Sequence, residues 1–289
     1  MANTIALAKN YTSILDEVYK GASVTADLTS DNTMVRAGAN ANEIVYPQIS
    51  VSGLGDYSRN SGYTEGSVNL EWKTAQFNYD RGTKISVDVM DNEESRDIAF
   101  TMAGSELMRT KVAPEADAFT FATLAGIAGI SKATPATYAD ATAFLSALIE
   151  AKNKMDEDEV PEEGRILYAT PTLMNGVMAL DTTKSREVLA SFSAIKKVPQ
   201  SRFYTAIDLL SGKDGEEAGH YKKAAAGKDI NFMIVHKPAV IKFDKHTASD
   251  IIPASANANA DADISKYRKY GIVDVYQNKV AGIYLSHKE

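Results

Sequence analysis

The 289-residue sequence contains no cysteine, which excludes disulfide bonds, thiol nucleophiles and cysteine-ligated metal sites. It also lacks any run of 18 apolar residues, and its N-terminal stretch has neither the apolar core nor the cleavage site of a secretory signal. Lysine and arginine do not cluster, and the net charge of -7 disfavours tight nucleic-acid binding. These absences favour a protein that folds in a reducing cytoplasm without a membrane anchor.

Motifs that bind phosphate or activate a nucleophile are also missing. No GxxxxGK[ST] segment occurs, and residues 211–213 (SGK) lack the upstream glycine that such a loop requires. A GxSxG segment is absent as well. No two histidines have the spacing of four residues that a helical zinc motif needs. The histidines are His220, His236, His246 and His287. The sequence therefore predicts neither a cofactor nor an enzymatic activity.

Two features keep an enzymatic alternative open. His236 and His246 flank one predicted strand with Asp244 nearby, which suits a metal or acid–base site, although surface histidines at strand ends are the ordinary interpretation. The run DEDEVPEEG at residues 156–164 has six carboxylates, but no histidine joins it and its proline and glycine mark a loop. We interpret the run as a solvated turn. A hydrolase or metal enzyme remains the alternative.

The longest predicted element is a helix over residues 91–126. Asp91 and Glu94 have the spacing of a capping box, and from Ile98 onward apolar residues recur at intervals of three and four. Pro114 lacks a backbone N–H and is expected to kink the helix. At 1.5 Å per residue the segment would span roughly 54 Å, which suits a scaffold better than a catalytic platform.

The N-terminal region predicts a helix followed by an open segment. Residues 4–20 are amphipathic, because apolar side chains that include Tyr11 and Ile14 fall on one face. Residues 22–42 are small and polar, and such a composition buries little. This segment is either a flexible connector or part of an arm whose helix packs on a neighbouring subunit. In the second case Tyr11 and Ile14 are candidate inter-subunit contacts.

Residues 43–90 predict a long β-excursion with a polar, glycine-rich tip. Residues 43–51 have the pattern of a strand in which Pro47 suits an edge position, since proline cannot donate to a β-ladder. Two alternating strands follow, with a predicted turn at residues 80–82 between them. A ribbon of this length with few core partners is marginal alone. We therefore expect it to pack against another copy of the chain.

Three residues of the β-excursion are candidate inter-subunit contacts. Trp72 shares a strand face with Val68 and Leu70, and without interleaved basic residues a core or interface position is favoured over base stacking. Arg59 and Glu65 lie at the glycine-rich tip and have the charges for ion pairs between subunits. An exposed ion pair contributes only about 1 kcal/mol or less, so these two residues are interface candidates only.

The second half of the sequence mixes helices with strands. Thr170 has the residue type of a helix N-cap, and Pro171 suits the first helical position. A turn at residues 277–279 is predicted to join the last two strands as a terminal hairpin. The predicted elements are a helix at 138–156, a buried strand at 165–169, a helix from Pro171 to about Leu180, strands at 230–235 and 239–243, and closing strands at 271–276 and 280–285.

Six segments carry a resemblance to a known family through their order and spacing, although none of them is diagnostic alone. They are IALAKNYTSILDEVY, DNEESRDIAF with MRTKVAPEADAF, EEGRILYATPTLM, VPQSRFYTAI, DINFMIVHKPAVIKFDKH and YGIVDVYQNKVAGIYL. In this order the chain resembles the major capsid protein of tailed bacteriophages over nearly its whole length. That family shares its fold with encapsulin shells and the herpesvirus capsid floor.

The resemblance implies an α+β class and the phage major capsid protein fold. Its parts would be an N-terminal arm (1–42), an extended β-loop that lies across a neighbour (43–90), a long spine helix in a peripheral domain (91–160), an α/β axial domain around the five- and six-fold axes (161–260), and a C-terminal hairpin that returns to the peripheral domain (261–289). Tyr11, Ile14, Arg59, Glu65 and Trp72 would then lie at contacts between subunits.

The resemblance also implies a structural function. The chain would self-assemble as pentamers and hexamers into the icosahedral head of a virion, which is assembled in the host bacterial cytoplasm and encloses double-stranded DNA without sequence-specific binding. An encapsulin-like nanocompartment shell is the alternative. Expected partners are further copies of the chain, a portal and decoration proteins, with no membrane.

The family's assembly-controlling helical segment precedes the N-terminal arm. Here the predicted arm helix begins within a few residues of Met1. The expectation is therefore that such a segment was never present, that a separate scaffolding protein replaces it, or that it has been cleaved. The initiating methionine argues against cleavage.

Overall fold

The computed structural model of the chain describes residues 22–30, 36–37, 42–94, 98–213 and 219–289. The chain divides into two units, one formed by residues 1–30 and 79–289 and the other by residues 31–78. The predicted helix at residues 4–20, with Tyr11 and Ile14, lies outside the described residues.

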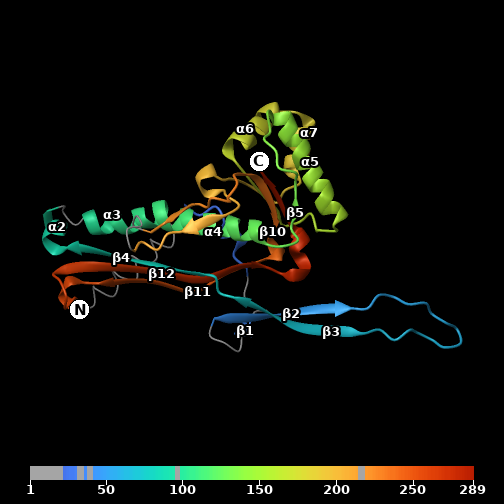
Figure 1. Cartoon of the computed structure of the whole chain (residues 1–289), viewed down its shortest axis with the longest axis horizontal. Helices are drawn as coiled ribbons and strands as arrows, with labels where there is room; N and C mark the ends of the chain where they lie inside the picture. The colour runs from blue at the N-terminus through green and yellow to red at the C-terminus, as the bar shows by residue number, and fades with distance from the viewer. Residues whose placement is uncertain (1–21, 31–35, 38–41, 95–97, 214–218) are drawn as a thin grey trace. The chain divides into compact units, whose positions relative to one another are not determined.

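A five-stranded mixed sheet forms one core of the larger unit (Figure 1). Its central strand β10 is antiparallel to both neighbours, β13 and β6, whereas the outer strands β5 and β7 are parallel to theirs. In spatial order the strands are β5 (Ser131–Lys132), β13 (Ile283–His287), β10 (Ile230–His236), β6 (Arg165–Ala169) and β7 (Ala194–Lys197).

Both faces of this sheet are covered, which explains why β6 and β10 are buried at every position. Successive side chains of β10 alternate between two hydrophobic clusters: Met233 and Val235 belong to one, and Phe232 and Ile234 to the other. The first cluster includes Phe121 and Leu124 of the long helical stretch. The second contains the buried faces of three helices, α5 (Ala141–Glu157), α6 (Pro171–Leu180) and α7 (Thr183–Ala190).

The starts of these three helices follow from their sequences. Asp140 caps α5 by accepting a hydrogen bond from the Ala143 N–H, and Thr182 and Ser185 form a capping box at α7. Pro171 occupies the first turn of α6, as predicted, although Thr170 makes no side-chain capping bond there. The predicted helix at 138–156 and buried strand at 165–169 are confirmed within three residues.

A second, antiparallel sheet has the order β11 (Val240–Ile252), β12 (Ala262–Val275) and β4 (Tyr79–Asp88). Along one face of β12, Tyr267 packs with Met108 of the long helical stretch. Shorter elements complete the larger unit. They are η1 (Ala26–Leu28), η4 (Gln200–Arg202), β8 (Ile207–Leu209), β9 (Tyr221–Lys223), η5 (Lys237–Ala239), η6 (Ala254–Ala256) and η7 (Gln277–Gly282).

The long helical stretch consists of α2 (Val89–Glu94), α3 (Ile98–Leu107), a π-helical turn η3 (Met108–Val112) and α4 (Ala113–Gly126). The Ala113 N–H donates to the Met108 carbonyl five residues back. This wide turn directly precedes Pro114, whose missing N–H disturbs the regular ladder, and the predicted kink at Pro114 stays a prediction. The predicted cap at Asp91 is wrong: α2 begins earlier, and the Asp88 carboxylate accepts the Met90 N–H.

The smaller unit is an antiparallel sheet in the order β1 (Arg36–Ala37), β2 (Glu43–Val51) and β3 (Val68–Gln76). Strand β1 pairs only with Ile44 and Val45 of β2. At Pro47, among the described residues, β2 therefore has a strand partner on one side only, as predicted from the missing proline N–H.

The predicted hairpin around residues 80–82 is wrong. Strand β3 pairs with β2, whereas β4 runs straight through Arg81 and Gly82 and pairs with β12. A Cβ atom on Gly82 would lie 2.8 Å from the Tyr267 carbonyl oxygen. The glycine therefore permits a close cross-strand approach, which the sequence pattern does not distinguish from a turn.

The predicted terminal hairpin at 271–285 is also wrong. Residues 271–275 belong to β12 and pair with β11, while β13 pairs with β10 and β5. The 3-10 segment η7 carries the chain from one sheet to the other. Local turn chemistry is the same for a hairpin and for such a crossing, and the burial of β13 in the five-stranded core decides between them.

Candidate functional site

The candidate interaction site is one face of the β2–β3 hairpin. Ile49 lies directly opposite Leu70, and Val51 lies opposite Val68. Opposite residues and every second residue along a strand project to the same face. The side chains of this apolar face are Val45, Pro47, Ile49, Val51, Val68, Leu70 and Trp72.

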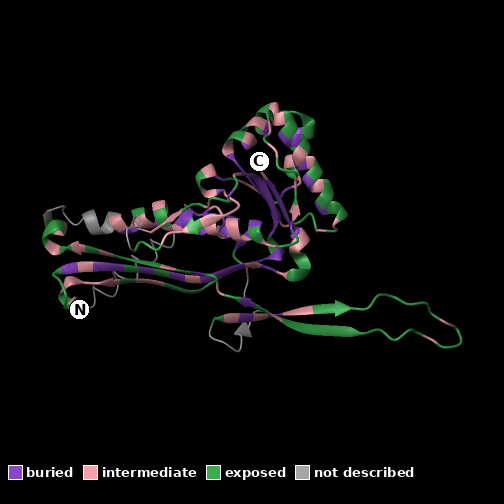
Figure 2. Cartoon of the chain, viewed as in Figure 1, coloured by how far each residue is buried: buried purple, intermediate pink, exposed green. Residues whose placement is uncertain are grey.

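Most of the apolar face is open to solvent in the single chain (Figure 2). Exposure of its large side chains ranges from 47% for Trp72 to 71% for Val68. The opposite face of the same stretch carries polar residues, which are Gln48, Ser50, Asn69, Glu71 and Lys73. A contiguous exposed apolar surface of this kind marks a place where a partner docks.

The connection between β2 and β3 is also exposed to solvent. Ser58 and Gly62 form an isolated β-bridge, and the Ser58 hydroxyl oxygen accepts two backbone N–H groups inside the turn. The rings of Tyr57 and Tyr63 lie 4.8 Å apart, and both side chains are exposed. Leu54 is fully exposed as well. The tip is thus a defined turn with an aromatic pair beside it.

The structure places the predicted contact residues in different settings. Trp72 lies on the apolar face opposite Pro47, and Arg59 and Glu65 are exposed in the tip. Their role as contacts remains a prediction, and Tyr11 and Ile14 lie outside the described residues. Sequence reasoning missed Ile49 and Val51, although their alternation along EIVYPQISV, matched to that of VNLEW, signals one shared face.

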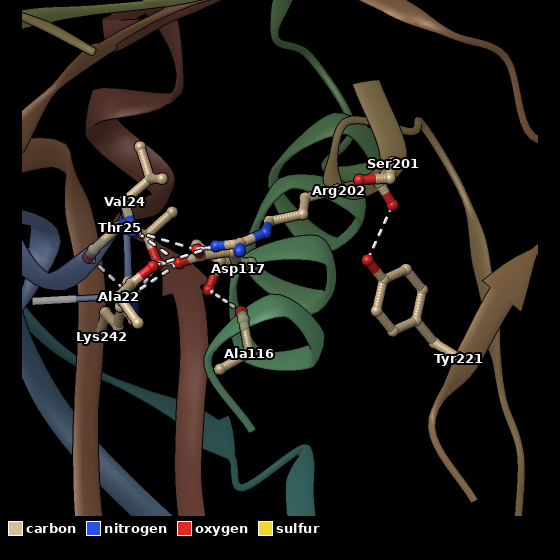
Figure 3. A network of polar contacts seen from close by, with 11 residues as sticks. Ala22, Val24, Thr25, Ala116, Asp117, Ser201, Arg202, Tyr221 and Lys242 are labelled. Atoms are coloured by element: carbon tan, nitrogen blue, oxygen red, sulfur yellow. Dashed lines mark hydrogen bonds and ion pairs between the residues drawn. The ribbon is translucent and has the colours of Figure 1, made fainter. Parts of the chain in front are cut away.

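A buried polar network anchors residues 22–30 to the body of the larger unit (Figure 3). Its centre is Asp117 of α4, whose side chain is fully buried. The Asp117 carboxylate accepts the hydroxyl groups of Ser23 and Thr25, both at 2.7 Å, and the backbone N–H groups of Val24 and Thr25. Arg202 adds an ion pair at 3.1 Å. Five donors therefore satisfy the buried charge.

Lys242 of β11 completes this network from the other side. Its ammonium group donates to the Thr25 carbonyl oxygen at 2.9 Å and to the Thr25 hydroxyl at 2.6 Å. The Lys242 backbone also exchanges hydrogen bonds with Ser30, and Leu28 is buried in the core. The interpretation of residues 22–42 as an open connector is therefore wrong for 22–30. Small polar side chains are buried there because each has a hydrogen-bond partner.

The stability of the larger unit is expected to rise with pH between about pH 8 and pH 10. Burial lowers the pKa of Lys242 from 10.5 to about 8, against the opposing attraction of Asp117. In this window the unfolded chain binds the proton that folded Lys242 has lost, so the free energy of unfolding rises by up to about 1.4 kcal/mol per pH unit. Urea titrations of the unsubstituted chain and of Lys242→Met check this, because the slope should vanish in the variant.

The urea titrations are kept below pH 10, because burial raises the pKa of Tyr221 to about 12. Above pH 10 this tyrosine ionises in the unfolded chain before it does so in the folded chain, which lowers the free energy of unfolding. Equal slopes in the unsubstituted chain and in Lys242→Met would contradict the assignment of the rise to Lys242.

A second ionic cluster joins β4, α4 and the segment after β8. Arg81 donates to the Glu115 carboxylate at 2.7 Å and to the carbonyl oxygens of Leu210 and His220. Tyr79 donates to the same carboxylate. Burial opposes ionisation of Glu115, but contacts with His220 and Arg81 outweigh it and hold its pKa below the usual range. Arg81 and Tyr79 both donate to this carboxylate, so the cluster fixes structure, whereas the buried Nδ1 atom of His220 has no hydrogen-bond partner in the described part of the chain.

The features that suggested chemistry are not assembled into a site. His236 ends β10 in one sheet, whereas His246 is exposed on β11 in the other. In the acidic run, Asp156 pairs with buried Arg165, and Asp158 pairs with Lys154. Among the described residues, no group of three or more acidic or histidine side chains is placed to hold a metal ion. No helix in the same described ranges is long and apolar enough to cross a membrane.

The architecture is α+β: the larger unit has a long helical stretch beside an antiparallel sheet and a helix-covered mixed sheet, and the smaller unit is a hairpin with a short third strand. This is the fold of phage capsid structures. The capsid structure of the cyanophage P-SCSP1u matches with a TM-score of 0.58 at 15% identity, covering 88% of this chain and 85% of that one. A chain of Mycobacterium phage Che8 matches with a TM-score of 0.60 at 12% identity, covering 91% and 90%.

The same fold occurs in a virus-like particle from Pyrococcus furiosus. That structure matches with a TM-score of 0.59 at 8% identity and covers 97% of this chain and 99% of that one. Neither the comparison with protein-family models nor the comparison with curated proteins finds a match. The similarity is therefore one of fold, which confirms the fold class predicted from the sequence.

Proposed function

We propose that this chain is the major capsid subunit of a tailed bacteriophage. The observation that carries the proposal is its fold, which matches a cyanophage capsid chain over 88% of its length. Pentamers and hexamers of the chain would close into an icosahedral head around double-stranded DNA. The role is structural rather than enzymatic, and the protein would be a virion component that is assembled in the host cytoplasm.

The apolar face of the hairpin supports a mechanism for assembly. A stable interface buries on the order of 1,200 Å² in total, and a long hairpin laid on a neighbour adds contact area without thickening the wall. Head-to-tail contacts of this kind close into rings when the rotation between subunits allows it. Trp72, Arg59 and Glu65 would then lie between subunits, as would Tyr11 and Ile14 of the N-terminal arm. Covering the apolar face provides the driving force.

Strand pairing refines the expected division into parts. We assign β11 to the peripheral part, because it pairs with β12 in the sheet that also contains β4. We assign α5 to the axial part, because its apolar face packs on the five-stranded sheet. The N-terminal arm (1–42) and the extended loop (43–90) keep their proposed roles, except that residues 22–30 anchor the arm and β4 belongs to the peripheral sheet.

A nanocompartment shell is the second candidate, because the virus-like particle from Pyrococcus furiosus covers 97% of this chain. Neighbouring genes discriminate between the two. Portal, protease and terminase genes would indicate a phage, whereas an adjacent cargo enzyme would indicate a compartment. In the phage case, a separate scaffolding protein, a portal and decoration proteins are the proposed further partners.

Electron microscopy of the purified chain at high concentration, with sedimentation velocity alongside, tests the proposal. Closed shells, tubes or rings of five and six subunits are the expected species, and shell diameter separates a phage head from a small compartment. A species that stays monomeric under all conditions, including after addition of candidate scaffolding proteins, would overturn the shell function.

Shortening the tip of the hairpin is expected to block shell closure without unfolding the subunit. The Ser52 N–H already donates to the Ser67 carbonyl oxygen at 2.9 Å, so an Asn-Gly turn can replace residues 53–66. All of the removed residues lie in the exposed tip, hence circular dichroism should be unchanged. Electron microscopy reports closure, and normal particles from the shortened chain would refute the role of the tip.

A further inference from the structure

Strand β3 is an open edge of the smaller unit (Figure 1). In the described three-stranded sheet it lies at the end of the order and pairs only with β2. Seven of its nine residues are exposed, its sequence VNLEWKTAQ contains no proline, and its register with β2 runs without a bulge. Prolines and bulges are the usual devices that stop an edge strand from pairing with another chain. Strand β3 is therefore a template for a further strand.

The hydrogen bonds at the two ends of the hairpin determine which backbone groups of β3 point outward. The Ser52 N–H donates to the Ser67 carbonyl oxygen at one end, and the Phe77 N–H donates to the Asn42 carbonyl oxygen at the other. Hydrogen-bonded and non-hydrogen-bonded pairs alternate along an antiparallel ladder. The odd-numbered residues of β3 therefore bond to β2, whereas the even-numbered residues direct their N–H and C=O groups away from it. These are Val68, Leu70, Trp72, Thr74 and Gln76.

The opposite edge of the hairpin is less suited to strand addition. Strand β1 already pairs with Ile44 and Val45 of β2. By the same alternation Pro47 occupies an outward-facing position, and it has no N–H to donate. An added strand would thus lose a hydrogen bond beside β2 that it can form beside β3. This difference points to β3 as the edge that is used.

We propose that β3 pairs antiparallel with β3 of a second copy of this chain, about a two-fold axis at Trp72. In this register Leu70 lies opposite Thr74 of the second copy, and Val68 lies opposite Gln76. The outward N–H and C=O groups of these four residues then exchange hydrogen bonds between the copies. Directly opposite residues share a face, so the two apolar faces join into one, with Trp72 beside its own counterpart.

The charges of β3 select this register. Glu71 and Lys73 project to the polar face, and they form an ion pair of 2.7 Å within the chain. With the axis at Trp72, Glu71 lies opposite Lys73 of the second copy, and Lys73 lies opposite its Glu71. The adjacent registers that keep the outward groups paired would place Glu71 opposite Glu71, or Lys73 opposite Lys73. Like charges directly opposite each other destabilise a sheet, so both alternatives are disfavoured.

The inference deepens the proposed function, because it names the part of a neighbouring copy that the hairpin meets, and it rests on self-association of the chain. An isologous contact of this kind is compatible with head-to-tail rings, since an icosahedral shell contains two-fold axes between its rings. The experiments below are chosen so that loss of the strand pairing and loss of shell formation give different results.

Disulfide trapping in the full chain tests the register. The sequence has no cysteine, so Glu71→Cys and Lys73→Cys each carry a single thiol. In a mixture of the two variants, the thiols occupy a non-hydrogen-bonded pair, where Cβ atoms are close enough for a disulfide. After oxidation by copper phenanthroline we expect at least about tenfold more mixed dimer than from Glu71→Cys with Ser50→Cys. Ser50 is exposed on the same polar face but lies on β2. An affinity tag on one variant identifies the mixed dimer.

Charge reversal tests the same register without a covalent link. Glu71→Lys alone, or Lys73→Glu alone, places like charges opposite each other on both sides of the axis, so association measured by sedimentation velocity should weaken about tenfold. Mixing the two variants should restore it, because each opposite pair then has one ammonium and one carboxylate group. Neither variant keeps the ion pair within its own chain, so restoration reports a contact between copies.

The matched control mixture is Glu187→Lys with Lys184→Glu. Both residues are exposed on α7, and the charge changes are the same. Each control variant, alone or mixed, should associate like the unsubstituted chain. Weakening and restoration in this control as well would show attraction between net charges and would overturn the register. Closed particles without the mixed disulfide would overturn the strand pairing and leave the shell function intact. The mixed disulfide in a chain that never closes would support the pairing and contradict the shell function.

Discussion

Lysine at positions 49 and 70 is expected to abolish shell formation while leaving the subunit folded. Ile49 and Leu70 lie opposite each other on the apolar face, and both are more than half exposed in the single chain, so the new ammonium groups remain hydrated there. Covering them with a neighbour would bury two unpaired charges, which costs about 3–5 kcal/mol per contact. Because every subunit repeats the contact, we expect no closed particles by electron microscopy and a subunit-sized species by sedimentation velocity.

The matched control for this variant is Ser50→Lys/Asn69→Lys. Ser50 and Asn69 are also directly opposite each other, one position along each strand, and therefore project to the other face. The control adds the same charges to the same hairpin and should still assemble. Loss of assembly in both variants would make charge rather than the apolar face responsible, and normal shells from Ile49→Lys/Leu70→Lys would remove the face from the interface.

Replacing Asp117 by alanine is expected to lower the free energy of unfolding by about 3–5 kcal/mol, because it leaves buried polar groups without their shared acceptor. The carboxylate accepts five hydrogen bonds, four of them from residues 23–25. The loss should be visible as a lower urea midpoint and as new proteolytic cleavage within residues 22–30. Both readouts follow from release of the same segment.

Asp181→Asn provides the control for the loss of a carboxylate. Asp181 pairs with Arg186 at the surface, where both side chains are well exposed, and an exposed pair is worth about 1 kcal/mol or less. Asparagine also accepts the positive φ of this position. A change in Asp117→Ala no larger than that in Asp181→Asn would show that the buried network does not hold the segment.

Local structure in this chain was predictable where neighbouring residues determine it. The apolar spacing of Phe144, Leu148 and Met155 determines which face of α5 is buried, and the run RILYA identifies a strand covered on both faces. Pro114 located the irregular turn in the long helical stretch, and Pro47 located an edge in β2. In each case the responsible chemistry lies within a few positions of the residue itself.

Strand pairing was not predictable in the same way. The alternation in β4 shows that one face is half-buried, but it does not name β12, whose Tyr267 and Lys269 lie more than 180 residues away. Gly82 had the signature of a turn, and residues 277–279 had that of a hairpin. Both patterns also occur where a strand passes close to another strand or changes sheet, so the sequence did not distinguish these cases.

By itself, the sequence determined the elements, their order and the alternation that makes one face of the hairpin apolar, because these follow from side chains two to four residues apart. The order of the elements was also sufficient to predict the capsid fold. Only the tertiary structure decided which strands pair and that residues 22–30 are held by Asp117 and Lys242. These contacts join residues far apart in the chain, and their existence depends on the packing of the whole core.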